Sequence, residues 1–213
     1  MSFTHTNPTQ PLKNHKNSNR QPNFLSTYSI QTEDDLALAG ALVLMETGEN
    51  PERESLKNTP TRYSKAMKDL LSGYQQDLSQ VIGSGIFDAE GAGLVSVREI
   101  EFYSLCEHHL LPFWGKVNVA YFPDRKILGL SKIPRIVDHY SKRIQVQERL
   151  TEQIALAIEQ TINPRAIAVR IQAYHLCMMM RGIEKQGSHT LTETARRMNN
   201  LTSSEQERLW KAL

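Results

Sequence analysis

The sequence predicts an α+β protein: an antiparallel sheet with helices on one face, preceded by an N-terminal helical hairpin. Three observations lead to this prediction. Helical spacing of apolar residues dominates the first third of the chain. Residues 94–105 and 166–177 instead alternate and are rich in β-branched and aromatic residues, which is typical of strands. The predicted strands also come in two consecutive pairs separated by two helices, and consecutive strands usually pair as antiparallel hairpins.

Residues 31–93 are predicted to form a helical region. A first helix begins near Thr32, followed by acidic residues and by an apolar stripe that starts at Leu36. A second helix begins at the sequence NTPTR, where Thr59 is placed to cap and Pro60 to occupy the first helical position. These two helices form the expected hairpin.

Residues 94–213 are predicted to form the main domain. The expected strands cover 94–105, 117–121, 166–177 and 186–194, and the expected helices start at Ser131 and cover 147–162 and 204–212. LPFWG, residues 111–115, is interpreted as the connection between the first two strands.

The composition is that of an ordinary globular protein, with 213 residues, 39% hydrophobic residues and a net charge of +2. This charge gives no case for binding nucleic acid or an anionic membrane, and no apolar run approaches the roughly 20 residues that span a bilayer. Residues 1–30 are polar and are predicted to be a disordered tail. Their basic residues leave a transit peptide as the alternative, but they lack an amphipathic apolar face, so we expect a cytoplasmic protein.

Both cysteines of the chain have histidine neighbours. In the sequence CEHH, Cys106 and His109 lie three residues apart at the end of a predicted strand, where a tight turn would bring both to one point. Thiolate and imidazole are preferred ligands of zinc. His108 stands next to a candidate ligand, so its side chain is expected to point elsewhere and to be available for acid–base chemistry.

The second cysteine, Cys177, follows His175 by two residues on a predicted strand, so the two side chains would share a face. If Cys177 joins Cys106 and His109, three ligands and an open position would make a catalytic zinc site. With His175 as a fourth ligand the site would be structural, and the residues leave both possibilities open. Without a metal, the two thiols would simply pack as small hydrophobic groups.

Two further polar groups open predicted helices. Ser131 is placed to cap its helix, and Lys132 and Arg135 share one face, which favours an anion near the helix N-terminus; a solvated basic face is the alternative. Gln147 and Glu148 begin the long helix. A carboxylate and an amide there suit the N–H donors of a guanine edge, although an acid in the first turn also complements the helix dipole.

The motifs, taken in series, resemble GTP cyclohydrolase I. They read CEHHLLPFWGKVNVAYFP, LGLSKIPRIV, QVQERLTEQIA and HLCMMMRGIEK, together with NTPTR, and the likeness spans residues 33–194. The resemblance implies the tunnelling fold, an antiparallel sheet with two helices on one face, and makes 94–213 its catalytic domain. It also implies a homodecamer of two stacked pentamers with active sites at the subunit contacts.

The resemblance also implies a role for each candidate residue. Cys106, His109 and Cys177 would bind a zinc ion, and His108 and His175 would transfer protons. Guanine would be held by Glu148 and the backbone of Gln147. The triphosphate and ribose would be received by Ser131, Lys132, Arg135, Arg62 and Arg181, the last from a neighbouring subunit.

The implied reaction opens the imidazole ring of GTP by hydrolysis, releases formate and closes the ring of 7,8-dihydroneopterin triphosphate, the first step of tetrahydrofolate and pterin biosynthesis. Two other functions fit parts of the pattern. An NADPH-dependent nitrile reductase of the same fold would use a nucleophilic cysteine without zinc, which the paired CEHH and HLC sequences disfavour. A non-catalytic zinc- and GTP-binding regulatory subunit would have no use for both His108 and His175.

Overall fold

The computed structural model describes residues 34–91 and 93–213. The chain divides into two compact units, Met1–Met67 and Lys68–Leu213, which are described separately. The tail predicted to be disordered, residues 1–30, lies outside the described residues, as does the expected helix start at Thr32.

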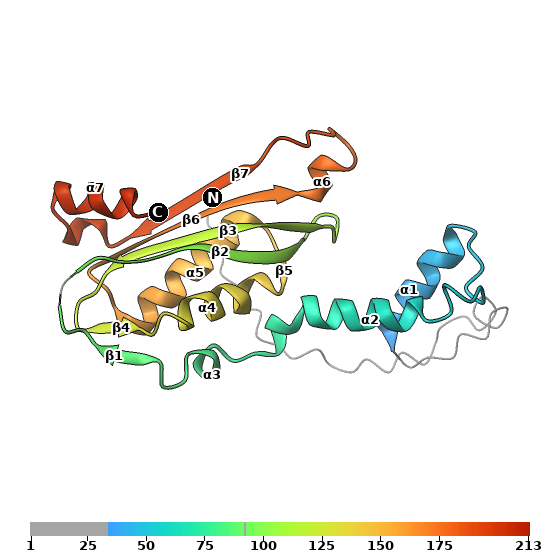
Figure 1. Cartoon of the computed structure of the whole chain (residues 1–213), viewed down its shortest axis with the longest axis horizontal. Coiled ribbons are helices and arrows are strands. Elements are labelled where there is room, and N and C mark those ends of the chain that lie inside the picture. Colours follow the sequence, from blue (N-terminus) through green and yellow to red (C-terminus); the bar gives the residue numbers. More distant parts are fainter. Residues whose placement is uncertain (1–33, 92) are drawn as a thin grey trace, which may run out of the picture. The chain divides into compact units, whose positions relative to one another are not determined.

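The first unit contains α1 (Asp35–Glu46) and most of α2 (Thr59–Leu70), drawn in blue and cyan in Figure 1. Asp34 caps α1, because its carboxylate accepts hydrogen bonds from the backbone N–H groups of Leu36 and Ala37. The same carboxylate accepts a hydrogen bond of 2.7 Å from Ser64 Oγ on α2. A Cβ added at Gly40 would lie 3.0 Å from the Tyr63 ring, so the two helices pack closely. The predicted helical pair is therefore present.

The second unit is built on a five-stranded sheet in the order β5-β2-β3-β6-β7 (Figure 1). Its strands are β2 (Val95–Cys106), β3 (Pro112–Phe122), β5 (Ile144–Gln145), β6 (Ala166–His175) and β7 (Thr190–Arg196). The β2–β3, β3–β6 and β6–β7 pairs are antiparallel, and only the short β5 runs parallel to β2. The predicted antiparallel sheet with its two hairpins is thus confirmed.

The remaining elements connect and cover this sheet. A separate two-stranded sheet joins β1 (Ile86–Asp88) to β4 (Lys126–Leu128). The helices are η1 (Ser72–Gln75), α3 (Leu78–Ile82), α4 (Lys132–Ser141), α5 (Gln147–Ile162), α6 (Leu176–Met179), η2 (Met198–Asn200) and α7 (Ser203–Lys211). No helix in the described ranges is both long and apolar enough to cross a bilayer.

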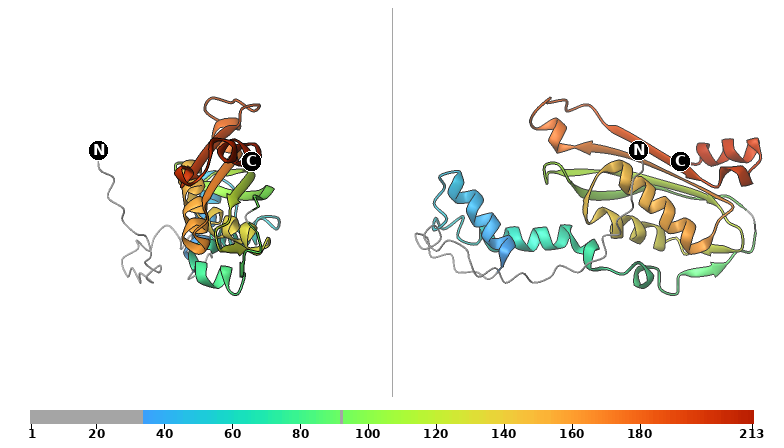
Figure 2. Two further views of the ribbon diagram at one scale, coloured as in Figure 1. Left: turned by 90° about the vertical axis from the view of Figure 1, so that its left-hand side faces the viewer. Right: turned by 180° about the vertical axis from the view of Figure 1, so that it is seen from behind.

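The main core lies between the sheet and the helices α4 and α5, which cover the same face (Figures 1 and 2). Strand residues and helix residues interdigitate there; among those fully buried are Phe113, Val117, Val119, Tyr121, Ile133, Ile136, Ile154 and Ile171. The expected α+β arrangement, with two helices covering one face, is therefore confirmed for α4 and α5, while the C-terminal α7 packs on the other face. A second, smaller cluster on the even-numbered positions of β3, around Ala120 and Phe122, includes Leu209 of α7.

Five details of the prediction were wrong. Thr59 is the first residue of α2 and not its cap, so Pro60 takes the second helical position, and the last strand spans Thr190–Arg196 instead of 186–194. The segment 111–115 is not a connection, because β3 begins at Pro112 and its alternation runs back from Val117 to the buried Phe113. Proline is tolerated there as the first residue of the strand. The late strand ends at His175, and Cys177 belongs to the helical turn α6. Ser131 makes no side-chain cap, because its own backbone is already helical.

Gly115 marks a very close approach of β3 to β6. A Cβ at this position would lie 1.9 Å from the carbonyl oxygen of Gln172 and 2.7 Å from Cα of Ala173. Both are backbone atoms of the paired strand, so they can yield only if the ladder distorts. We expect Gly115→Ala to lower the free energy of unfolding by about 1–3 kcal/mol, measured by chemical denaturation.

Gly187→Ala is the matched control for this substitution, since nothing lies within 4 Å of a Cβ added there. Its expected effect is within about 0.5 kcal/mol. Equal denaturation midpoints for the two variants would show that β3 and β6 are not packed as closely as described.

Candidate metal centre

Two cysteines and one histidine converge at one end of the sheet. The ligand atoms of Cys106, His109 and Cys177 all lie within 4.8 Å of one another. The strand register explains the meeting: Leu105, next to Cys106, pairs with Pro112 at the start of β3, while His175 at the end of β6 pairs with Phe113. The ends of β2 and β6 therefore flank the same end of β3.

A tight turn after β2 positions Cys106 and His109. The N–H of Cys106 donates to the carbonyl of Leu111 at 2.9 Å, and the N–H of Leu110 donates back to the carbonyl of Cys106 at 2.8 Å. Leu110 has a φ of 54°, an unusual value for a bulky side chain, which the surrounding turn must hold in place. The expectation that a turn brings the first and last residues of CEHH together agrees with this geometry.

The chain leaves the extended conformation directly after β6. The N–H of Met180 donates to the carbonyl of Leu176 at 3.0 Å, which closes the helical turn that carries Cys177. His175 and Cys177 consequently do not share a strand face, contrary to the expectation. Cys177 approaches Cys106, whereas Nε2 of His175 lies 2.8 Å from Oε1 of Gln147. Within the described part of the chain, His175 is not a member of the metal-binding group.

The donor atoms fit a tetrahedral zinc site. The two sulfur atoms are 4.0 Å apart, and two thiolates at about 2.3 Å from a tetrahedral ion would be about 3.8 Å apart. Burial, and next the neighbouring Cys106, raise the pKa of the Cys177 thiol above its ordinary value. Two thiols held this close are suited to a cation, which would replace their protons. The cluster could therefore hold a metal ion.

Both candidate proton-transferring histidines lie beside this cluster. The half-buried ring of His175 stacks on the buried Phe113, with centroids 4.6 Å apart and planes 2° from parallel. Burial lowers the pKa of His175, and the nearby Glu148 carboxylate opposes that shift. His108 is exposed, and its Nδ1 lies 3.7 Å from Sγ of Cys106. The expectation that the His108 side chain points away from the candidate ligands was therefore wrong, because its ring faces Cys106.

The candidate guanine-binding residues begin α5. Glu148 is exposed and close enough to His175 to influence its pKa. Gln147 is 2% exposed and its side chain is turned inward, so only its backbone remains for a ligand. Val146, the residue that precedes α5, provides no side-chain cap for the N–H groups of the first turn.

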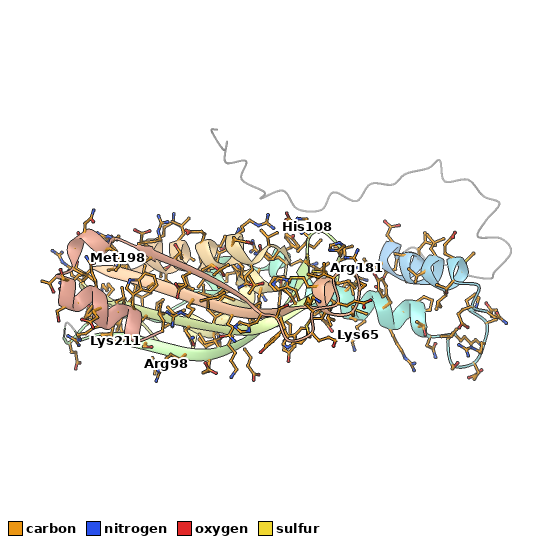
Figure 3. All side chains as sticks on the ribbon, turned by 90° about the horizontal axis from the view of Figure 1, so that it is seen from above. Lys65, Arg98, His108, Arg181, Met198 and Lys211 are labelled. Carbon is orange, nitrogen blue, oxygen red and sulfur yellow. The ribbon has the colours of Figure 1, made fainter. Side chains whose placement is uncertain are left out.

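The candidate phosphate-binding residues are distributed over three places. Arg181 is exposed, and its Nη1 lies 3.3 Å from both Nε2 of His109 and the carbonyl of Cys177; Figure 3 shows it at the same end of the unit as His108. Arg62 lies exposed on α2 in the first unit.

The third place is the start of α4. Lys132 is half-buried there, with Nζ 3.4 Å from the carbonyl of Val81. Ser131 and Arg135 are exposed. Among the residues that the structure describes, no hydrogen bond or ion pair links these three to the metal-binding cluster.

Several residues at the site were missed by sequence reasoning. Phe113 was assigned to a connection, although extending the alternation of β3 backwards would have placed it inside. Arg149 forms an ion pair of 2.6 Å with Glu107 and donates to Oε1 of Gln145 at 3.0 Å, which ties the CEHH turn to the start of α5. Nothing in the local sequence indicated that Thr192 lies next to Gln147.

The fold and the site together define an α+β protein with a Cys–His–Cys cluster that could hold a metal ion and two further histidines at the end of its sheet. The model of the family described as GTP cyclohydrolase I matches residues 38–212. The chain is 55% identical over 152 residues to GTP cyclohydrolase 1 of Leptospira biflexa, which covers 71% of this chain and 83% of that protein. It is 56% identical over 150 residues to GTP cyclohydrolase 1 of Alkalilimnicola ehrlichii, covering 70% and 81%.

The chain therefore belongs to the GTP cyclohydrolase I family, and it is an enzyme. The resemblance inferred from the four motifs is confirmed. Among solved structures, the apo form of the archaeosine synthase QueF-Like matches with a TM-score of 0.43 and 18% identity, covering 51% of this chain and 97% of that one.

Proposed function

We propose that this chain opens the imidazole ring of GTP by hydrolysis at a zinc ion, releases formate and closes the product to 7,8-dihydroneopterin triphosphate. Family membership supports the reaction. The observation that carries the zinc assignment is the convergence of Cys106, His109 and Cys177 at the end of the sheet. Three ligands leave a fourth position for water, as in catalytic rather than structural zinc sites.

Zinc in such a site supplies an activated water molecule at neutral pH. Residues of the chain bind and orient the substrate. The carboxylate of Glu148 accepts hydrogen bonds from the N–H donors of guanine, and the backbone at Gln147 binds the same base at the N-terminus of α5. This orientation presents carbon 8 of the base to the metal centre.

Two histidines carry out the proton transfers of the reaction. Protonation of nitrogen 7 makes carbon 8 electrophilic, and His175 and His108 are the groups beside the cluster that can deliver that proton. After the first addition the ring opens to an N-formyl group, and a second hydrolysis releases formate. The ribose then rearranges to a ketone, and the freed amine closes on it.

The triphosphate remains intact, so cationic residues position it and do not cleave it. We assign this role to Ser131, Lys132, Arg135, Arg62 and Arg181. The contact of Arg181 with His109 supports a place near the metal centre. In the proposed oligomer, with active sites at the subunit contacts, this exposed side chain serves the site of a neighbouring subunit.

We further propose a homodecamer of two stacked pentamers that catalyses the first step of tetrahydrofolate and pterin biosynthesis in the cytoplasm, without nucleic acid or membrane partners. Among the described strands, β2 pairs on its outer side only with Ile144 and Gln145, and β7 has a single neighbour. Such open edges suit sheets that join side by side. We also propose that the chain is divided into a tail at 1–30, a helical region at 31–93 and a catalytic domain at 94–213.

Metal analysis combined with GTP turnover tests this function. We expect about one zinc per chain and the appearance of pterin fluorescence on incubation with GTP, together with formate. Zinc and GTP binding without fluorescence would identify a regulatory subunit instead. NADPH oxidation with a cyano-deazaguanine substrate, without a need for zinc, would identify a nitrile reductase.

A further inference from the structure

The side chain of Gln147 makes four hydrogen bonds at the start of α5. Its Nε2 lies 3.0 Å from the carbonyl oxygens of both Ile171 and Thr190 and 3.1 Å from Oγ1 of Thr192. Its Oε1 lies 2.8 Å from Nε2 of His175. This buried amide therefore connects α5, β6 and β7 to one of the two proton-transferring histidines.

The surrounding acceptors fix the orientation of the amide. A carbonyl oxygen accepts hydrogen bonds and never donates them, so the atom facing Ile171 and Thr190 must be the NH₂ group of Gln147. A flipped amide would set its oxygen against two carbonyl oxygens and leave buried groups without partners, which is costly. The amide oxygen, which only accepts, must consequently face His175.

Two hydroxyl groups support the same orientation. Oγ1 of Thr151 lies 2.8 Å from the backbone carbonyl of Gln147, which can only accept, so the single hydroxyl proton of Thr151 is used there. The contact of 2.7 Å between Thr151 and Thr192 must then use the proton of Thr192. Thr192 is left with a lone pair for Nε2 of Gln147, whose two protons are shared among three acceptors.

This network determines which nitrogen of His175 is protonated. Because Oε1 of Gln147 accepts, Nε2 of His175 must donate and carry a hydrogen. The stacked ring of Phe113 fixes the plane of the imidazole. In the neutral ring the other nitrogen, Nδ1, then carries a lone pair.

We propose that Gln147, held by Thr151 and Thr192, is a positioning residue that fixes the orientation of the His175 ring and its Nε2–H tautomer. Its catalytic consequence rests on the proposed function. The tautomer itself is a property of the folded protein, whether or not the protein turns over GTP.

Nitrogen NMR of the histidine rings tests the tautomer directly. The metal-loaded full chain is labelled with ¹⁵N-histidine and studied by magic-angle spinning, which suits an assembly of any size. The signals of His175 are assigned by their loss in His175→Ala. A protonated Nε2 is expected, and a ring with a protonated Nδ1 and an unprotonated Nε2 would overturn the proposal.

Kinetics of Thr192→Val test the role in catalysis. This near-isosteric change removes one acceptor from the Gln147 amide, and we expect kcat to fall by about 10-fold or more while metal content and KM for GTP stay within about twofold. Thr192→Ser keeps the hydroxyl and should recover most of kcat. A rise in KM with unchanged kcat would assign the network to substrate binding and overturn the positioning role.

Thr194→Val is the matched control. Thr194 lies two residues further along β7, and its hydroxyl bonds to the exposed Glu152 instead of the network. We expect wild-type kcat for this variant, and an equal loss in both valine variants would refute a specific effect of Thr192. If the wild-type chain shows the expected tautomer but no turnover of GTP, the proposed function fails while the assignment of the tautomer stands.

Discussion

Replacing Cys177 with serine is expected to remove the bound metal and the turnover of GTP together. The serine hydroxyl stays protonated at neutral pH and is a poor zinc ligand, so only Cys106 and His109 would remain. A catalytic metal contributes several kcal/mol to the stabilisation of the transition state, which corresponds to a loss of about 10³-fold or more in kcat/KM. Zinc per chain and formate release are the two measurements.

Met180→Leu serves as the control for this experiment, since Met180 lies at the end of the same helical turn and is 62% exposed. It should retain both metal and activity. If Cys177→Ser kept a full complement of zinc, Cys177 could not be a ligand, and the Cys–His–Cys centre would have to be abandoned.

His175→Ala is expected to keep the metal and lose turnover. Nε2 of His175 is engaged by Gln147, and the ring does not belong to the group of converging ligands, so its removal leaves the three donors in place. Loss of a positioned proton donor costs about 10²–10⁴-fold in rate. We therefore expect zinc content and GTP binding to stay at the wild-type level, while formate release is lost.

The matched histidine control is His189→Ala. His189 is exposed, and its ring packs edge-on against Tyr174, 5.9 Å away, rather than against the metal centre. Its replacement should leave turnover unchanged. Should His175→Ala lose zinc while His189→Ala retains it, His175 would be a metal ligand and the open coordination position would not exist.

The fold could be predicted from the sequence where a pattern repeats often enough. The long strands β2 and β6 and the helix α5 show their period over ten residues or more, and they were placed within a few residues. The strands β1, β4 and β5 have only two or three residues, too few to display an alternation. Local pattern also did not reveal that β6 ends at His175, because Leu176 and Cys177 continue the apolar character of the strand.

The convergence of Cys106, His109 and Cys177 was predictable as a set of residue types, since both cysteines stand near histidines. The sequence could not decide between a closed site with four protein ligands and an open site with three, because that depends on the orientation of the His175 ring. That orientation is set by Gln147, 28 residues earlier, and by Thr192 on β7. Contacts between residues far apart in the sequence leave no trace in the spacing of a motif.

The two candidate sulfur ligands are separated by 71 positions in the chain. An ion bound between them would act as a crosslink. On unfolding, the chain would either keep the ion and lose conformational entropy, or release it and lose the binding free energy. For a closed loop of that length the chain-entropy model gives a contribution of about 4 kcal/mol. We therefore expect that a chelator that removes the ion also lowers the Tm, so that the protein loses thermal stability together with activity.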